Sequence, residues 1–177
     1  MNGENRKPCM FEHERALNEF MVDYLERLVS DLDETDLDFQ PFDDFNPPRW
    51  ILGHLAINND YALRILGDRF QCPKEWHRSF ARGTPSTSRP LAVPSKDPLM
   101  ERIRTGFRQV CKLTEAADLE TMRHPHNVPF LKETSIKTVG QVISHLMTTH
   151  LATHVGQLSA WRRATRRPPV SLGRETP

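Results

Sequence analysis

Three of the chain's eight histidines, His145, His150 and His154, fall in one short stretch of the sequence. His150 and His154 are four residues apart, so in a helix they lie about 40° apart on one face. Two imidazoles one turn apart can bind a single metal ion, provided that a third ligand comes from elsewhere. The same spacing also occurs where histidines line a pocket or lie on a helix surface.

His145 is predicted to take no part in such a site. In a continuous helix it lies about 180° from His154, so one helix cannot direct both side chains at one ion. We expect His145 to be a packing or interface residue. The same back face carries the small residues Ala152, Gly156 and Ser159, which permit another helix or subunit to approach closely.

His54 is the best candidate for a third ligand. The segment 46–66 has helical periodicity, and one of its faces is expected to point inward. That face holds Trp50, His54, Ile57, Asn58, Tyr61 and Ile65, whereas Arg49, Gly53, Asp60 and Arg64 are expected to face solvent. An inward histidine among apolar neighbours is unusual, because its imidazole must lose water on burial.

Three imidazoles with an open fourth position are typical of catalytic rather than structural zinc sites. A divalent ion held in this way lowers the pKa of a bound water or thiol and so yields a nucleophile near neutral pH. Imidazole also suits nickel and iron. We predict zinc or nickel, with iron or manganese as alternatives, and a small-molecule substrate.

The remaining pattern predicts an all-α protein with one domain. Apolar residues recur at helical spacing over 10–32, 46–66, 97–117 and 138–164, and no strand-like alternation occurs. Thr138 and Gln141 form a capping-box pattern at the start of the last helix. A four-helix bundle over 10–167 is therefore expected, between a flexible N-terminus at 1–9 and a C-terminal tail at 168–177.

Two long connections, 68–96 and 118–137, interrupt the predicted bundle. The first contains four prolines, and loops of this length in compact domains are often functional. It is expected either to cover a site as a lid or to be a tolerated excursion. His124 and His126 in the second connection are expected to be loop residues.

Composition excludes several classes of protein. The 177 residues include 24 Lys and Arg against 23 Asp and Glu, a net charge of +1, which gives no reason to expect nucleic-acid binding. The three cysteines form no metal-binding motif. No apolar run is long enough for a membrane span and no signal peptide is visible, so a cytoplasmic protein is predicted. The arginines near 162–167 are expected to be a solvated helix end.

Two motifs resemble those of the DinB-like superfamily of DNA-damage-inducible bundle proteins. The segment Trp50-Ile51-Leu52-Gly53-His54-Leu55 is similar to the W-x-x-x-H-L signature of that family's second helix. The segment 150–158 is similar to its H-x-x-x-H-x-G-Q-[LI] motif. The resemblance implies a four-helix bundle with long crossover connections, a homodimer, and His54, His150 and His154 as ligands of a divalent metal.

The sequence departs from the family pattern at Leu151 and Thr153, where many members carry Glu and a further His. An acid–base role at these two positions is therefore not expected. Polar side chains that share faces with the ligands, Asn58 and Gln157, are assigned as partners of the ligands or as core residues. The aromatic residues Trp50, Tyr61 and Trp161 are assigned as pocket walls or as plain core.

Characterised relatives in the superfamily include metal-dependent transferases that use bacillithiol, mycothiol or glutathione, and a mycothiol-dependent maleylpyruvate isomerase. The resemblance therefore implies a metal-dependent enzyme that activates a small thiol or water, resembling thiol S-transferases or hydrolases. The sequence offers no obvious protein nucleophile, since Cys111 is expected to face the core. The alternative is a non-catalytic metal-binding stress-response protein or a dimeric interaction protein.

Overall fold

The structure is a computed structural model that describes residues 10–86 and 93–173. This part of the chain is helical and forms no β-strand, apart from one isolated bridge between Pro125 and Thr138. The predicted all-α bundle is confirmed. The predicted N-terminus at 1–9 lies outside the described residues. Among the residues described, no helix is both long and apolar enough to cross a membrane.

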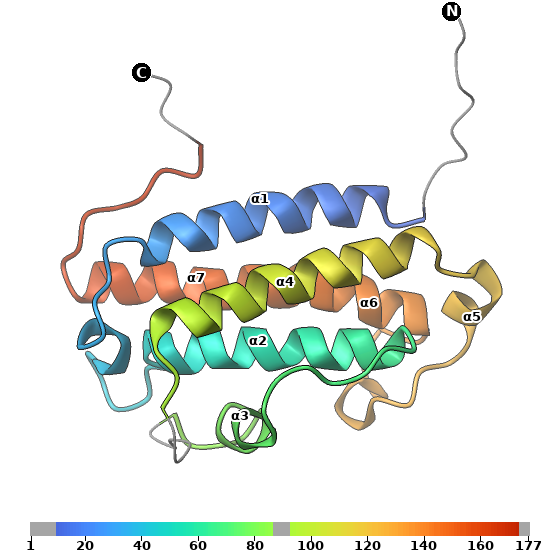
Figure 1. Ribbon diagram of the computed structural model, residues 1–177, viewed down its shortest axis with the longest axis horizontal. Coiled ribbons are helices and arrows are strands. Elements are labelled where there is room, and N and C mark those ends of the chain that lie inside the picture. The colour runs from blue at the N-terminus through green and yellow to red at the C-terminus, as the bar shows by residue number, and fades with distance from the viewer. Residues whose placement is uncertain (1–9, 87–92, 174–177) are drawn as a thin grey trace, which may run out of the picture.

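Four long helical rods lie side by side in the bundle (Figure 1). They are α1 (Glu12–Val29), α2 (Pro48–Ile65), α4 (Lys96–Glu115) and the consecutive pair α6 (Val139–Met147) and α7 (Thr149–Ala164). The connections contain short helices that the sequence did not predict: α3 (Lys74–Ser79), α5 (Leu119–Arg123), and 3-10 turns at Asp36–Asp38 and Pro129–Leu131.

Helix α2 is the centre of the fold and is buried along most of its length. It packs against α4, α6, α7 and α3, so little of its surface is left for solvent. The prediction that Arg49, Gly53 and Asp60 face solvent is therefore wrong, and only Arg64 of that set is exposed. Apolar periodicity does not predict their burial, because they are covered by other segments of the chain, which the sequence of α2 alone does not identify.

Gly53 permits one of these close approaches. A Cβ atom built on Gly53 would lie 2.4 Å from the ring carbons of Phe80, the residue that follows α3. That distance is far inside van der Waals contact, so the absence of a side chain on α2 allows the buried Phe80 ring to rest on its backbone.

The sequence predicted one continuous helix over 138–164, but the structure breaks it at Thr148 into α6 and α7. Thr148 has φ −125° and ψ −81°, its N–H is shared between the carbonyls of Ser144 and His145, and its hydroxyl donates to Ser144 O at 2.6 Å. Such a hydroxyl competes with the helical hydrogen bonds. Asn18 of α1 donates its side-chain amide to Met147 O at 2.8 Å, at the break. The predicted capping box of Thr138 and Gln141 is confirmed.

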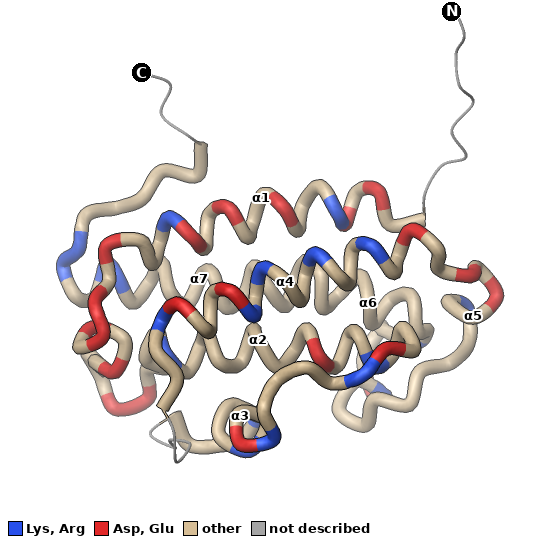
Figure 2. Tube along the Cα trace, viewed as in Figure 1, with Lys and Arg blue, Asp and Glu red and all other residues tan. Residues whose placement is uncertain are grey.

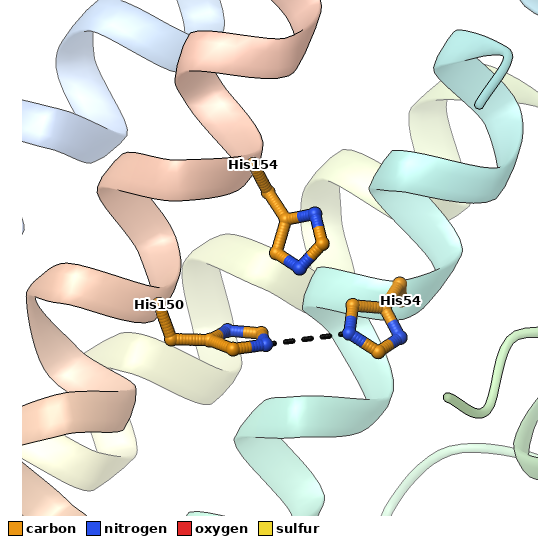
Figure 3. Close-up of side chains that lie close together, drawn as sticks. All are labelled: His54, His150 and His154. Carbon is orange, nitrogen blue, oxygen red and sulfur yellow. Dashed lines mark hydrogen bonds between the residues drawn. The ribbon is translucent and has the colours of Figure 1, made fainter. Parts of the chain in front are cut away.

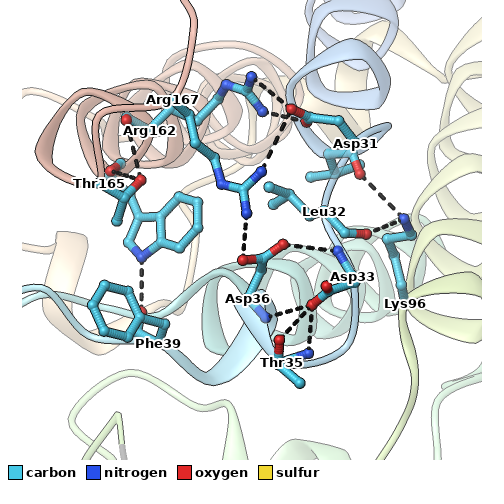
Figure 4. Close-up of polar contacts among 12 residues, drawn as sticks. Asp31, Leu32, Asp33, Thr35, Asp36, Phe39, Lys96, Arg162, Thr165 and Arg167 are labelled. Carbon is cyan, nitrogen blue, oxygen red and sulfur yellow. Dashed lines mark hydrogen bonds and ion pairs between the residues drawn. The ribbon is translucent and has the colours of Figure 1, made fainter.

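Charged residues gather at one end of the bundle. Figure 2 shows acidic residues along the connection from α1 to α2, close to basic residues at the end of α7. Arg162 is only 3% exposed and binds Asp31, Leu28 O and Pro168 O, while Arg167 binds Asp31 and Asp36 (Figure 4). The prediction of a solvated helix end is therefore wrong for these two arginines. It is correct for Arg163 and Arg166, which are exposed.

Candidate metal centre

His54 of α2 and His150 and His154 of α7 point toward one another across the contact between their helices (Figure 3). Each can offer a nitrogen such that all three nitrogens lie within 4.8 Å of one another. The ring centroids of His154 lie 4.6 Å from those of both His54 and His150. The structure thus brings together three imidazoles that are separated by about a hundred residues of sequence.

Hydrogen bonds on the outer side orient two of the rings. His54 Nδ1 lies 2.7 Å from the carbonyl oxygen of Phe80, which can only accept, so the proton of the neutral ring is on Nδ1. His154 Nδ1 lies 2.9 Å from Gln157 Oε1 and is protonated in the same way. Both rings therefore direct the unprotonated Nε2 toward the centre of the cluster, which is the form that binds a metal.

His150 supplies the third nitrogen and is poorly satisfied in hydrogen bonding. Its Nε2 lies 3.3 Å from His54 Nε2, and its buried Nδ1 has no hydrogen-bond partner among residues 10–86 and 93–173. A neutral His150 can protonate only one nitrogen, so it leaves Nδ1 unpaired in either tautomer, at an expense of about 1–3 kcal/mol.

The separation of the nitrogens fits a metal ion. Two histidine nitrogens about 2.0–2.1 Å from one tetrahedral zinc ion lie roughly 3.4 Å apart. The 3.3 Å between Nε2 of His54 and Nε2 of His150 is close to this value. These residues therefore fit a divalent metal, which would take the place of the hydrogen bond between the two nitrogens.

Burial keeps the three histidines neutral. Loss of water lowers the pKa of His54 to about 4 and that of His150 to about 3, helped in both by repulsion from the neighbouring imidazoles. Burial also lowers the pKa of His154, against the hydrogen bond that His154 donates to Gln157. Neutral imidazole is the ligating form, so no proton has to leave when a metal binds near neutral pH.

Trp50 and Gln157 are the two other predicted pocket residues that lie at the cluster. The Trp50 ring stacks on His54 with centroids 4.7 Å apart and lies 6.3 Å from His154. Its Nε1 donates to Thr84 Oγ1 at 3.4 Å. The indole therefore contacts both the histidine cluster and the connection after α3, and its role as a pocket wall stays a prediction.

The other three predicted pocket residues make their contacts elsewhere. Asn58 donates its side-chain amide to the backbone carbonyl of His54, not to its ring. Tyr61 is 40% exposed and packs against Phe70 and His77. Trp161 is fully buried and donates Nε1 to Phe39 O at 2.8 Å. A pocket role for Asn58, Tyr61 and Trp161 stays a prediction.

His145 lies closer to the cluster than its sequence position predicted. The break at Thr148 turns α6 relative to α7, and the His145 ring comes to lie 5.6 Å from that of His150. Its Nδ1 is 2.6 Å from Thr149 Oγ1. It does not belong to the group of three converging ligand atoms.

The contact that sequence reasoning missed is that of Phe80, whose carbonyl oxygen orients His54. Every residue has a backbone carbonyl, so the residue types do not predict which carbonyl accepts from His54. The one available signal was Gly53, a glycine inside an otherwise regular helix next to a candidate ligand, which indicates close approach of another segment.

Comparison with known proteins points to one family. A model of the DinB superfamily matches residues 18–158. No curated protein matches the chain. Among solved structures, the crystal structure of a conserved protein of locus from Enterococcus faecalis is similar, with a TM-score of 0.72 and 14% sequence identity. The alignment covers 89% of this chain and 98% of that one. At this identity the similarity shows the fold alone.

Proposed function

The chain belongs to the DinB superfamily, and we propose that it is a metal-dependent enzyme whose histidine cluster activates a small thiol or water. The observation that carries the proposal is the convergence of three imidazoles, those of the buried His54 and His154 and the half-buried His150, with ligand nitrogens within 4.8 Å of one another. Zinc and nickel are the first choices of ion, and iron and manganese are the alternatives. The substrate is a small molecule.

Each ligand of the proposed site has a defined part. His54, held by Phe80 O, and His154, held by Gln157, offer Nε2 in fixed orientations. His150 offers the third nitrogen from the next turn of α7. A divalent ion held by these three would supply Lewis acidity at its open position. The Trp50 indole shields His54 from water on one side.

The nucleophile is proposed to come from outside the chain because the described cysteines are unsuited to the role. Burial raises the pKa of the Cys72 thiol above its usual value, with a further contribution from Asp60. Burial likewise raises the pKa of Cys111 to about 11. Neither thiol is ionised near neutral pH, so neither is a ready nucleophile. Bacillithiol, mycothiol and glutathione are candidate external thiols.

A thiol-transfer assay tests the proposal. Protein loaded with zinc or nickel is mixed with each thiol and a halogenated aromatic, and halide release is measured. A carbon–sulfur bond forms, the carbon–halogen bond breaks, and the thiol proton passes to solvent. We expect turnover with at least one thiol and none in His150→Ala. Full activity in the metal-free protein contradicts the mechanism, and no turnover with any thiol or by hydrolysis favours the alternative below.

The alternative is a non-catalytic metal-binding stress-response protein or a dimeric interaction protein. It is supported by apolar residues on the outside of α1, where Leu17 is 54% exposed and Phe20 is 46% exposed. Exposed Ala152 and Gly156 of α7 add a surface of small residues, with open space where a Cβ of Gly156 would be. A homodimer would cover such surfaces. Light scattering of the wild type and of Leu17→Glu tests the dimer.

The cytoplasm is retained as the proposed location. Cys72 and Cys111 are both free thiols, which suits a reducing compartment. Cell fractionation tests this assignment.

A further inference from the structure

Helix α3 rests on α2 through contacts at both of its ends. At the C-terminal end, Phe80 places its ring on Gly53 and its carbonyl oxygen 2.7 Å from His54 Nδ1. At the N-terminal end, the anchor is Asp60, which lies six residues after His54, about 9 Å further along the axis of α2. The six-residue α3 therefore bridges a candidate metal ligand and a buried acid.

Asp60 binds three donors with a single oxygen. Its side chain is fully buried, and Oδ2 accepts from the N–H of Gln71 at 3.0 Å, the N–H of Cys72 at 2.7 Å and Nε2 of His77 at 2.9 Å. Burial alone would raise the pKa of Asp60, but these hydrogen bonds, that of His77 foremost, hold it below its usual value. The carboxylate thus ties down both the segment that enters α3 and α3 itself.

His77 is held firmly against α2. Its ring lies 5.6 Å from that of Tyr61 and 4.9 Å from that of Phe70, in addition to its bond to Asp60. His77 and Phe80 are three residues apart, so they lie on neighbouring positions of one face. An isolated helix as short as α3 is not stable in water, so its anchors determine where the Phe80 carbonyl lies.

We propose that Asp60 and His77 are positioning residues for His54. Through α3 they set the Phe80 carbonyl, which holds the His54 proton on Nδ1 and leaves Nε2 free for the metal. The inference rests on the proposed metal site for its effect on affinity. The predicted effect on the His54 tautomer can be measured in the metal-free protein and does not depend on the metal site.

The test uses His77→Leu, which removes the donor to Asp60, and His77→Gln, whose amide can replace it. The first measurement is the ¹⁵N shift of the His54 ring nitrogens in metal-free protein. We expect wild type and His77→Gln to show protonated Nδ1, and His77→Leu to show a mixture of tautomers. The second is the zinc dissociation constant by chelator competition, which should rise about tenfold or more in His77→Leu, as for other partners of ligating histidines.

His126→Leu is the matched control. His126 also anchors a loop, with Nε2 bonded to Ile136 O and Nδ1 accepting from Val128 N–H. Its loss should lower thermal stability and leave the His54 tautomer and the zinc affinity unchanged. If it shifts both as much as His77→Leu does, the effect is general loosening and the inference fails.

A folded His77→Leu protein with wild-type His54 tautomer and zinc affinity overturns the inference. If His77→Leu does not fold, Asp60→Asn replaces it, because the amide retains one oxygen for the loop N–H groups and weakens the bond from His77. For Asp60→Asn, a mixture of His54 tautomers with weaker zinc binding supports the inference, and wild-type values of both overturn it. A wild type that binds no zinc refutes the metal site, while the tautomer measurement still decides whether α3 positions His54.

Discussion

The bundle buries polar side chains in two regions that differ in how these side chains are paired. At one end, Arg162 binds Asp31 (Figure 4) and the carbonyl of Leu28. Arg49 is likewise bound by Asp38 and by the carbonyls of Glu34 and Pro94. Between α2 and α7, three imidazoles face one another. Each region also holds one buried nitrogen with no hydrogen-bond partner among the described residues, His150 Nδ1 in the cluster and Arg162 Nε in the arginine network. The arginine network pairs cations with carboxylates, whereas the histidine cluster gathers three neutral nitrogen ligands.

The protonation of the two regions differs in the same way. The hydrogen bond from Arg162 holds the pKa of Asp31 below its usual value, so this carboxylate stays charged. Burial would lower the pKa of Arg49, but Asp38 and Glu34 raise it. In the cluster, burial lowers the pKa of every histidine. Paired charges therefore suit a structural role, and neutral imidazoles suit the proposed metal site.

The largest expected effect is on metal binding in the cluster. His54→Ala or His150→Ala removes one of three ligands, and the zinc affinity should fall by more than about 100-fold, the upper range for loss of an outer partner alone. Elemental analysis of the purified variants and chelator competition measure it. If both variants retain full metal, the cluster is not the site.

Next is the stability of the arginine network. Arg162→Met removes the donor to the carbonyls of Leu28 and Pro168 and leaves Asp31 with Arg167 alone, so the unfolding free energy should fall by about 2–4 kcal/mol. Urea denaturation measures the change, and zinc affinity should stay at the wild-type value. The neighbouring exposed Arg163→Met is the control, expected within about 0.5 kcal/mol of wild type. Equal losses in both variants would remove the distinction between the buried and solvated arginines.

The third prediction concerns pH in the metal-free protein. The folded-state pKa values of His54 and His150 are depressed below the usual 6.5, so the unfolded chain binds more protons between pH 6.5 and 4. Stability should therefore fall as pH falls through this window, by up to about 1.4 kcal/mol per pH unit for each of the two histidines. Urea denaturation at several pH values with a chelator present measures it.

His150→Phe is the matching variant for the pH experiment, because it removes the histidine with the lower pKa. Its stability should depend less on pH than that of the wild type over the same range. The network does not interfere, since the pKa of Asp31 is held below its usual 3.8 and its contribution is lost only at lower pH. An equal pH dependence in His150→Phe and wild type speaks against buried neutral histidines.

The smallest expected effect is at Gln157. Gln157→Leu removes the acceptor that holds the His154 proton on Nδ1, and zinc affinity should fall about tenfold. Thr153→Ala, an exposed position on the same helix, is the control and should bind zinc as the wild type does. Indistinguishable titrations of Gln157→Leu and Thr153→Ala would show that the amide is a core residue only.

The sequence was sufficient to predict the helical bundle and the convergence of His54, His150 and His154. Helical periodicity placed His54 on an inward face, and the spacing of His150 and His154 placed both on one side of α7. Thr138 marked the start of α6, because a capping box is formed by neighbouring residues. These features depend on local geometry, which residue order can convey.

Features that depend on contacts between distant segments could not be predicted. Arg49 and Asp60 are buried because their partners arrive from other parts of the chain. The break at Thr148 involves a carbonyl satisfied by Asn18 from α1. His145 was misplaced because helical angles cannot be added across a break. Whether a polar residue on an apolar helix is buried therefore depends on partners from other segments, which the sequence of that helix does not show.

The hydrogen bonds that the backbone amides of Gln71 and Cys72 donate to Asp60 have a consequence for hydrogen exchange. Amides in a connection normally exchange rapidly with solvent, but these two are bonded to a carboxylate inside α2. They can exchange only when the connection separates from that helix, so they belong to its cooperative unit. The exchange rates of these two amides therefore measure how often the segment that enters α3 separates from α2.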